Sequence, residues 1–263
     1  MSYGQNFHEF ARYERQMGYA SWGIAGQEKL KTARVGLVGC GGLGAAVALH
    51  LVRAGVGFLR VIDDDRVSLS NLHRQILYVE KDVANRCYKT RVAAERLLEA
   101  NSGAVVEPLV GRLTVDTVES FMHGLDLVVD GSDNFAARFL LNRAAVRFRM
   151  PWVYGGVGGA SGMTMTIVPG EGPCLRCVLS EAENSTDPLR DYGSAVVNSV
   201  VTIIAALQST EVYKLLIDPA SRNRDLLAVD VWDMSFCKMM VERDPICPVC
   251  SGLPGAEVGT HEG

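Results

Sequence analysis

Short apolar runs alternate with amphipathic segments along the first 156 residues. Runs of five or six apolar residues are typical of buried strands, whereas apolar positions three and four apart predict helices. Strands are predicted at residues 34–39, 58–63, 104–109, 125–130 and 151–156. Helices are predicted at residues 43–54, 89–99, 114–123 and 136–147. Strands that alternate with helices in this way predict a parallel, doubly wound sheet of the Rossmann type.

The second part of the chain has a different pattern. Residues 162–169 alternate between apolar and polar side chains, as in an antiparallel strand with one buried face. A polar loop is expected at 178–194, followed by a long apolar helix that ends near residue 216. Two further strands are expected at 226–232 and 235–243. The chain is therefore predicted to form an α/β fold in which antiparallel strands extend a mostly parallel sheet.

Length and composition favour one globular domain. The chain has 263 residues, of which 48% are hydrophobic and 21% are charged, and a single core can serve a chain of this size. We expect one domain over residues 1–252. It would comprise an N-terminal helical segment (1–30) and two halves (31–156 and 157–252), with a flexible tail at 253–263.

Charge and hydropathy argue against two classes of partner. The net charge of −4 gives no general attraction to nucleic acid phosphates, so no nucleic acid partner is expected. The N-terminus has no signal-peptide pattern, and the most apolar run, 195–207, falls short of the roughly 20 residues that span a bilayer. We therefore expect a cytoplasmic protein with no membrane association.

A glycine-rich turn joins the first predicted strand to the first predicted helix. Its G-x-G-x-x-G pattern contains Gly39, Gly41, Gly42 and Gly44. Glycine permits close approach of the backbone to phosphate, and the helix N-terminus supplies N–H donors and a partial positive charge. Asp63 ends the next predicted strand, where a carboxylate can bind ribose. The turn therefore predicts a nucleotide site, but it fits NAD, FAD and ATP about equally well.

The polar segment that follows Asp63 helps to choose between NAD, FAD and ATP. It contains Asn71, Arg74 and Gln75, which a dehydrogenase would not need at this place. Arginine's planar fork of donors matches phosphate oxygens and can stabilise charge that develops during phosphoryl transfer. The segment therefore favours a triphosphate. The simpler alternative is that Arg74 is a surface residue paired with a nearby aspartate.

Four of the seven cysteines form two C-x-x-C pairs, Cys174 with Cys177 and Cys247 with Cys250. In a cytoplasmic protein such pairs indicate metal ligands or redox thiols rather than disulfides. Two pairs fit a tetrahedral four-thiolate zinc site, and four thiolates leave no open position for catalysis. We therefore expect a structural zinc ion. A thioredoxin-like redox pair is the alternative, which the presence of two pairs disfavours.

Six segments, in this order, resemble the bacterial MoeB, ThiF and HesA adenylyltransferases of the ubiquitin-activating-like superfamily. They are RYERQ (12–16), GCGGLG (39–44), SLSNLHRQ (68–75), DGSDN (130–134), PCLRC (173–177) and CPVC (247–250). The resemblance covers residues 10–252. It implies that the half at 31–156 binds the nucleotide and that the half at 157–252 binds the protein substrate and zinc.

The resemblance also implies a reaction. ATP and the C-terminal glycine carboxylate of a small ubiquitin-like sulfur-carrier protein would give an acyl adenylate and pyrophosphate, for later thiocarboxylate formation in molybdopterin- or thiamine-type biosynthesis. The carrier would end in Gly-Gly, and a sulfur donor protein would be a second partner. Mg²⁺ would accompany ATP. A homodimer is implied as well, because in the family the arginine that matches Arg15 reaches the nucleotide of the neighbouring subunit.

The family's site residues carry over position by position. Residues implied to act on the phosphates, on Mg²⁺ or on the reacting groups are Arg15, Asn71, Arg74, Lys89 and Asp133. Residues implied to hold the nucleotide are Gly39, Gly41, Gly42, Gly44, Asp63, Asp65, Gln75 and Asn134. For Asp133 the alternative is an N-cap of the following helix.

Two departures from the family pattern affect these expectations. The loop at 178–194 contains no cysteine, so the chain is expected to stop at adenylation or to pass the adenylate to another protein's sulfur. The segment before Lys89 is longer than usual, so Arg86 could share the role of Lys89. The alternatives are adenylation of a peptide or a tRNA-linked carboxylate, an NAD-dependent oxidoreductase, and a carrier-binding scaffold without ATP chemistry.

Overall fold

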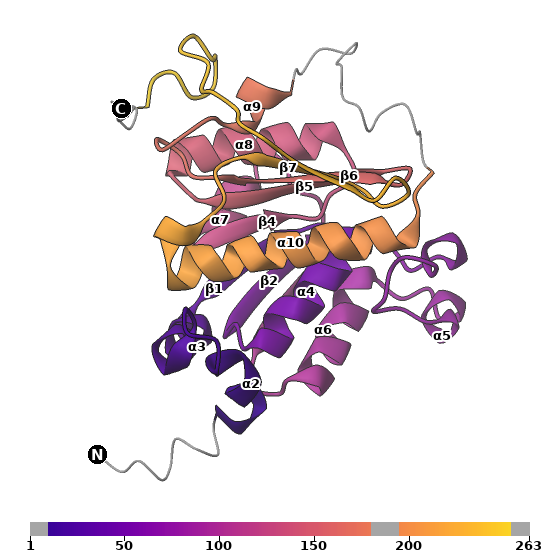
Figure 1. The fold of residues 1–263 in the computed structure, drawn as a ribbon. Coiled ribbons are helices and arrows are strands. Elements are labelled where there is room, and N and C mark those ends of the chain that lie inside the picture. Colours follow the sequence, from indigo (N-terminus) through magenta and orange to yellow (C-terminus); the bar gives the residue numbers. More distant parts are fainter. Residues whose placement is uncertain (1–9, 180–194, 254–263) are drawn as a thin grey trace.

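The computed structural model describes residues 10–179 and 195–253 (Figure 1). The expected loop at 178–194 and the expected tail at 253–263 therefore lie almost entirely outside the described residues. One eight-stranded sheet crosses the molecule in the order β3-β2-β1-β4-β5-β6-β7-β8. Its strands are β1 (Arg34–Val38), β2 (Phe58–Asp63), β3 (Val105–Val110), β4 (Leu127–Asp130), β5 (Trp152–Gly158), β6 (Ser161–Ile167), β7 (Leu226–Asp230) and β8 (Ser235–Met239).

The first five strands are parallel, which confirms the doubly wound half of the fold. β1 pairs with β2 and β4, and Val38 at its end lies opposite Ile62 and Asp130. All four residues of β4 are buried, as expected for a parallel strand that is covered on both faces. The register brings the carboxyl ends of β1, β2 and β4 to one edge of the sheet.

The last three strands are antiparallel, also as expected. Two of them are shorter than the sequence indicates, because β7 ends at Asp230 and β8 ends at Met239. The Asp230 carboxylate accepts hydrogen bonds from the backbone N–H groups of Trp232 and Asp233. These bonds start the turn into β8 two residues earlier than the apolar pattern suggests.

Helices cover both faces of the sheet. The described helices are η1 (Ala11–Tyr13), α2 (Glu14–Met17), α3 (Gly23–Thr32), α4 (Gly42–Ala54), η2 (Leu69–Asn71), α5 (Glu80–Ala84), α6 (Lys89–Ala100), α7 (Val118–Met122), α8 (Phe135–Phe148), α9 (Leu175–Val178), α10 (Asn198–Ile217) and η4 (Pro219–Ser221). One apolar cluster lies between the sheet and α4, α6 and α10, and a second lies between the sheet and α7 and α8. The helices α5 and α9 have no counterpart in the apolar pattern, whereas α2 and most of α3 lie within the expected N-terminal helical segment.

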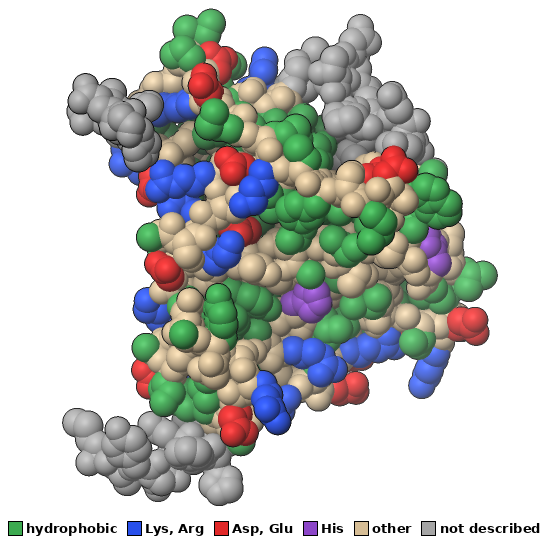
Figure 2. Space-filling model, in the orientation of Figure 1, with side chains coloured by type: hydrophobic (Ala, Val, Ile, Leu, Met, Phe, Trp, Pro, Cys, Tyr) green, Lys and Arg blue, Asp and Glu red, His purple; other side chains and the backbone are tan. Residues whose placement is uncertain are grey.

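Helix α10 lies across the sheet and packs against α4, β5 and β6 (Figure 1). Among the described residues, it is the helix long and apolar enough to cross a membrane by length and composition, and 44% of its most apolar window is buried. Its contacts with two strands mark it as a core helix. Figure 2 shows hydrophobic side chains gathered across the middle of the face that carries α10.

Candidate functional site

A cavity of about 1040 Å³ opens at the carboxyl ends of the parallel strands. Ligands of open α/β sheets bind at this edge. Its walls come from the β1–α4 turn, the end of β2, residues 74–75, the start of α6, residues 111–114 and residues 131–138. Val157, Ala195, Val196 and Val201 complete it from the second half. Most of the site residues expected from the sequence thus meet in one space.

The glycine-rich turn forms the floor of the cavity. Gly39, Gly41 and Gly42 line it, and Gly44 does not. Gly39 has φ of 87°, and a Cβ there would lie 2.6 Å from the carbonyl oxygen of Gly131. A Cβ on Gly44 would lie 2.0 Å from the carbonyl oxygen of Gly39. Gly44 therefore allows α4 to pack closely on the turn. A Cβ on Gly41, by contrast, would meet only the Gln75 side chain, at 3.5 Å.

Asp63 ties the end of β2 to this turn. One carboxylate oxygen accepts a 2.7 Å hydrogen bond from the Cys40 N–H, and the other accepts a 2.7 Å bond from the Asp65 N–H. Burial raises the pKa of Asp63, and the bond from Cys40 opposes this effect. The carboxylate lines the cavity, so its remaining lone pairs can accept hydrogen bonds from a ribose.

Lys89 supplies a cation at the start of α6. It is 4% exposed, and its ammonium lies 2.6 Å from the Asp65 carboxylate. Gln75 is also buried, and its side-chain oxygen is without a hydrogen-bond partner among the described residues. A buried acceptor of this kind normally has a partner. Lys89, Asp65 and Gln75 all line the cavity, so a polar ligand there could donate the hydrogen bond that the Gln75 oxygen lacks.

Arg74 lies along the first turn of α4. Its side-chain methylenes run beside Gly42, and one guanidinium nitrogen donates to the Ser70 carbonyl at 3.2 Å. Asn71 does not line the cavity. Its carbonyl accepts hydrogen bonds from the N–H groups of Arg74 and Gln75, both at 3.1 Å, so within this chain it holds their backbone in place.

Asp133 and Asn134 lie on the turn between β4 and α8, and both line the cavity. The N-cap of α8 is Asn134, whose side-chain oxygen accepts a 2.8 Å hydrogen bond from the Ala137 N–H. The alternative in which Asp133 caps this helix is therefore wrong. Asp133 is exposed, which leaves its carboxylate available to a ligand.

Arg15 and Arg86 stay outside the cavity. Arg15 is exposed on α2, and the adjacent Gln16 donates to the Ala54 carbonyl at the C-terminal end of α4. The cavity lies at the other end of α4, whose 13 residues span about 20 Å. Arg15 is therefore too distant to serve its own chain's cavity. Arg86 is exposed and does not line the cavity.

The motifs missed several residues of the site. Arg112 and Thr114 follow β3 and line the cavity, and Arg112 pairs with Asp64 at 2.6 Å. Their position after a parallel strand is a signal that could have found them. Buried Tyr78 donates a 2.7 Å hydrogen bond to the Cys40 carbonyl, which supports the glycine-rich turn from behind. The sequence carries no signal for this contact.

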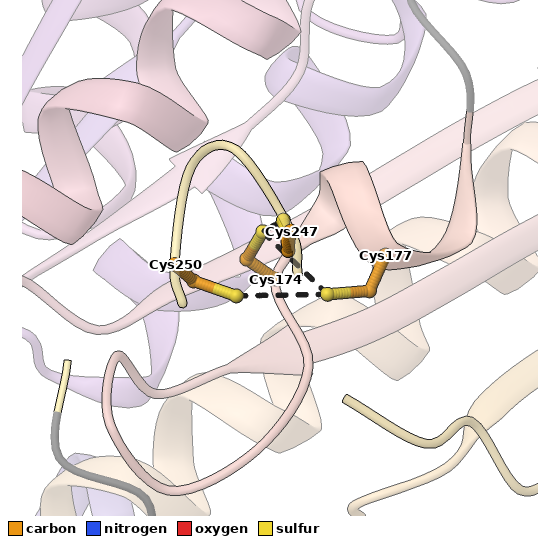
Figure 3. Close-up of side chains that lie close together, drawn as sticks. All are labelled: Cys174, Cys177, Cys247 and Cys250. Carbon is orange, nitrogen blue, oxygen red and sulfur yellow. Dashed lines mark hydrogen bonds between the residues drawn. The ribbon is translucent and has the colours of Figure 1, made fainter. Parts of the chain in front are cut away.

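The four paired cysteines converge at one point (Figure 3). Cys174 and Cys177 come from the segment around α9, and Cys247 and Cys250 come from the loop after β8. Their sulfur atoms all lie within 4.8 Å of one another. The closest sulfur–sulfur distances are 3.6 Å between Cys177 and Cys250 and 3.7 Å between Cys174 and Cys247.

These distances fit a tetrahedral metal site. Four thiolates at about 2.3 Å from a zinc ion would lie about 3.8 Å from one another. The hydrogen bond between the Cys174 and Cys177 sulfur atoms lowers the pKa of Cys177 to about 5 and raises the pKa of Cys174. Asn142 on α8 supports the first pair, since its side chain donates to the Cys174 sulfur and accepts from the Leu175 N–H. Such outer contacts are typical of metal sites.

Comparisons with known proteins agree with this geometry. The model of the ThiF family matches residues 13–249. The chain is 39% identical over 254 residues to the sulfur carrier protein adenylyltransferase of Thermus thermophilus, covering 94% of this chain and 92% of that protein. It is 34% identical to the sulfur carrier protein ThiS adenylyltransferase of Escherichia coli, covering 94% and 97%.

Among solved structures, E. coli MccB with ATP is similar with a TM-score of 0.78 and 30% identity, covering 91% of this chain and 74% of that chain. These matches confirm the resemblance that the six segments indicate. The chain belongs to the ThiF family of adenylyltransferases.

Proposed function

We propose that the protein uses ATP to adenylate the C-terminal glycine carboxylate of a small ubiquitin-like sulfur-carrier protein. One observation carries this proposal. A single cavity is lined by a glycine-rich helix N-terminus, by four cationic side chains, by four aspartates and by the apolar side chains of Val157, Ala195 and Val196. At about 1040 Å³ it lies at the upper end of the range for small-molecule pockets. It therefore has room for a nucleotide together with an extended peptide tail.

One wall of this cavity suits a tail without side chains. It is lined by Val157 of β5 and by Ala195 and Val196. The backbone there is closed by hydrogen bonds of 2.9 Å and 2.8 Å that Gly159 exchanges with Ala195 and Val197. A Gly-Gly terminus can approach such a wall closely because it has no side chains to accommodate.

In the proposed reaction, a carboxylate oxygen of the carrier attacks the α-phosphorus of ATP. A carbon–oxygen–phosphorus anhydride forms, the bond between the α- and β-phosphates breaks, and pyrophosphate leaves with the electron pair. The reactants are both anions, so catalysis consists mainly of alignment and charge neutralisation.

The roles of the lining residues follow from their chemistry. Asp63 accepts the ribose hydroxyls, and the N–H groups at the start of α4 face the phosphates. Arg74 and Lys89 neutralise phosphate charge. Asp133 is an exposed carboxylate of the cavity, as are Asp64 and Asp65. We assign Asp133 to Mg²⁺, an ion that is commonly held by one or two carboxylates together with substrate phosphates. Mg²⁺ would neutralise pyrophosphate charge.

A protein substrate is supported by the surface of the second half. Trp232, Met234, Phe236 and Met240, on or beside β8, are exposed, and β8 is an edge strand of the sheet. Apolar side chains on an unpaired edge are typical of a protein-binding surface. Residues 178–194 contain no cysteine, so the sulfur of a separate donor protein would attack the acyl carbon of the adenylate, with AMP as the leaving group.

A homodimer is part of the proposal. Helix α10 is only partly buried within one chain, with 44% of its most apolar window covered, and Arg15 lies too far from its own cavity. A two-fold dimer could place Arg15 at the partner's cavity. Two inactive variants, Arg15→Ala and Asp133→Ala, should then regain about a quarter of full activity when they are mixed and allowed to exchange subunits. Mixtures that stay inactive would place Arg15 outside the partner's site.

The main test is pyrophosphate–ATP exchange by the purified protein. Each Gly-Gly-ending carrier of the same genome is added separately, so that thiamine-type and molybdopterin-type carriers are distinguished. Exchange with one carrier is expected, together with its loss in Arg74→Ala and Asp133→Ala variants that fold and keep their metal. Exchange only with a short peptide would move the substrate to that class. No exchange with any acceptor, despite ATP binding, would overturn the proposal.

A further inference from the structure

A buried ion pair lies directly beneath the turn that carries Asp133. The Arg138 guanidinium is 3.2 Å from the Asp130 carboxylate, and the two residues are 6% and 0% exposed. Asp130 ends β4, and Arg138 lies in the first turns of α8. The pair therefore links the strand and the helix on either side of the turn.

Both members of this pair also hold Ser132, the residue before Asp133. The second Asp130 oxygen accepts hydrogen bonds from the Ser132 N–H at 3.0 Å and from its hydroxyl at 2.6 Å. The Arg138 guanidinium donates to the Ser132 carbonyl at 2.9 Å. The N–H and the carbonyl of one residue are thus fixed by opposite members of one ion pair.

The neighbours of this pair hold the turn from two further directions. From α10, the Gln208 amide donates a 2.7 Å hydrogen bond to the Asp130 carbonyl. After the turn, the side chain of Asn134 caps α8. Asp133 is therefore the exposed residue between two residues whose positions are fixed by hydrogen bonds.

Stability alone gives a weak reason for such a pair. Removing two charges from water is costly, and an apolar pair of similar size is often at least as stable. Burial raises the pKa of Asp130, and Arg138 opposes this by favouring the ionised form. What an apolar pair could not supply is the fork of donors that bridges a carboxylate and a carbonyl. The geometry is therefore suited to orienting the turn.

We propose that Arg138 and Asp130 are positioning residues that set the Asp133 carboxylate for Mg²⁺–nucleotide binding by fixing both backbone groups of Ser132. This inference rests on the proposed function for the role of Asp133. Arg138 also lines the cavity, and we assign its effect on Asp133 to its ion pair with Asp130 and its hydrogen bond to the Ser132 carbonyl. A displacement of about 1 Å at such a carboxylate is enough to lower a catalytic rate by two orders of magnitude.

The test compares two lysine variants on the same helix. Arg138→Lys keeps the charge but cannot bridge Asp130 and Ser132 with a planar fork. Arg147→Lys is the matched control, because Arg147 lies on the exposed side of α8, 3.9 Å from Glu119. In Arg138→Lys we expect at least a tenfold fall in the kcat of pyrophosphate exchange. We also expect about a tenfold rise in the Mg²⁺ concentration for half-maximal ATP binding. At saturating Mg²⁺ the KM for ATP should stay within about twofold of wild type.

A purely structural pair would give a different result. Arg138→Lys would then unfold at a lower temperature but match Arg147→Lys in Mg²⁺ dependence and in kcat per folded molecule, and this outcome would overturn the inference. If Arg138→Lys does not fold, Asp130→Asn replaces it with the same expected shift. The Mg²⁺ titration needs no carrier, so the inference can fail independently of the proposed acceptor.

Discussion

The backbone N–H of Cys40 lies 2.7 Å from the carboxylate of Asp63, although the two residues belong to different strand ends. The same carboxylate also accepts from the Asp65 N–H. The Asp63 side chain thus joins the glycine-rich turn to Asp65, whose carboxylate pairs with Lys89. The glycine-rich turn is therefore held in place by the chain itself, and a nucleotide would bind to a preformed surface.

Asp63→Ala is expected to weaken both the fold and nucleotide binding. The substitution leaves two backbone N–H groups without their acceptor, so the free energy of unfolding should fall by about 2–3 kcal/mol. The KM for ATP should rise at least about tenfold, since a hydrogen-bonding group to ribose is lost. Asp63→Asn keeps one acceptor oxygen and serves as the control, with a smaller effect on urea denaturation. An alanine variant as stable as wild type would contradict the bridging role.

Removal of metal is expected to destabilise the second half. We expect one zinc ion per chain, measured by atomic spectroscopy, and a thermal midpoint lower by at least about 10 °C after chelation. Cys174→Ala should lose metal and stability together, because it removes one of four thiolates and its contact with Asn142. Cys237→Ser, at an exposed cysteine of β8, should change neither. A stable, active and metal-free Cys174→Ala protein would show that the four thiols do not hold a structural ion.

The free thiols are expected to differ strongly in reactivity. Burial raises the pKa of Cys40 to about 12, so at pH 8 only about one Cys40 thiol in 10,000 would be a thiolate. Cys237 is exposed and should be alkylated first. Mass spectrometry of the native protein after brief iodoacetamide treatment should find label on Cys237 and none on Cys40. Label on Cys40 would mean that the glycine-rich turn opens readily.

His50 is expected to make stability depend on pH. Burial lowers its pKa in the folded protein, where its ring contacts the Ser209 hydroxyl at 3.3 Å. A lowered histidine pKa contributes stability that is present above the unfolded pKa of about 6.5 and is lost as pH falls below it. Between pH 7.5 and pH 5.5 the thermal midpoint of wild type should therefore fall further than that of His50→Gln. His123→Gln, at an exposed histidine, is the control and should follow wild type.

Much of the fold is visible in the sequence because buried parallel strands are short, continuous apolar runs. The run at 58–63 became β2 with the same bounds, and the segment at 34–39 became β1 one residue shorter. The convergence of the four cysteines was equally visible, since two C-x-x-C pairs with this spacing are a strong metal-ligand pattern. Where a side chain bonds to the backbone, as Asp230 does after β7, the strand ends earlier than the apolar pattern predicts.

The parts of the site that depend on tertiary contacts could not be predicted. Residue 138 lies within a predicted helix, but the local pattern does not show that the Arg138 side chain turns inward to Asp130. Asp133 and Asn134 are both good helix caps, and only the backbone path determines that Asn134 takes this place. The distance of Arg15 from its own cavity likewise depends on where α2 packs, which no local pattern encodes.

The change of strand direction after β5 separates the part of the sheet that we assign to the nucleotide from the part that we assign to the protein substrate. Parallel strands bring every carboxyl end to one edge of the sheet, so the groups that we assign to ATP all lie along that edge. Beyond β5 the strands are antiparallel, so successive strands end at opposite edges of the sheet. Residues there that contact the protein substrate can be substituted without moving the carboxyl ends of the parallel strands. Substitutions after residue 158 could therefore change which carboxylate substrate binds, while the residues assigned to the phosphates stay the same.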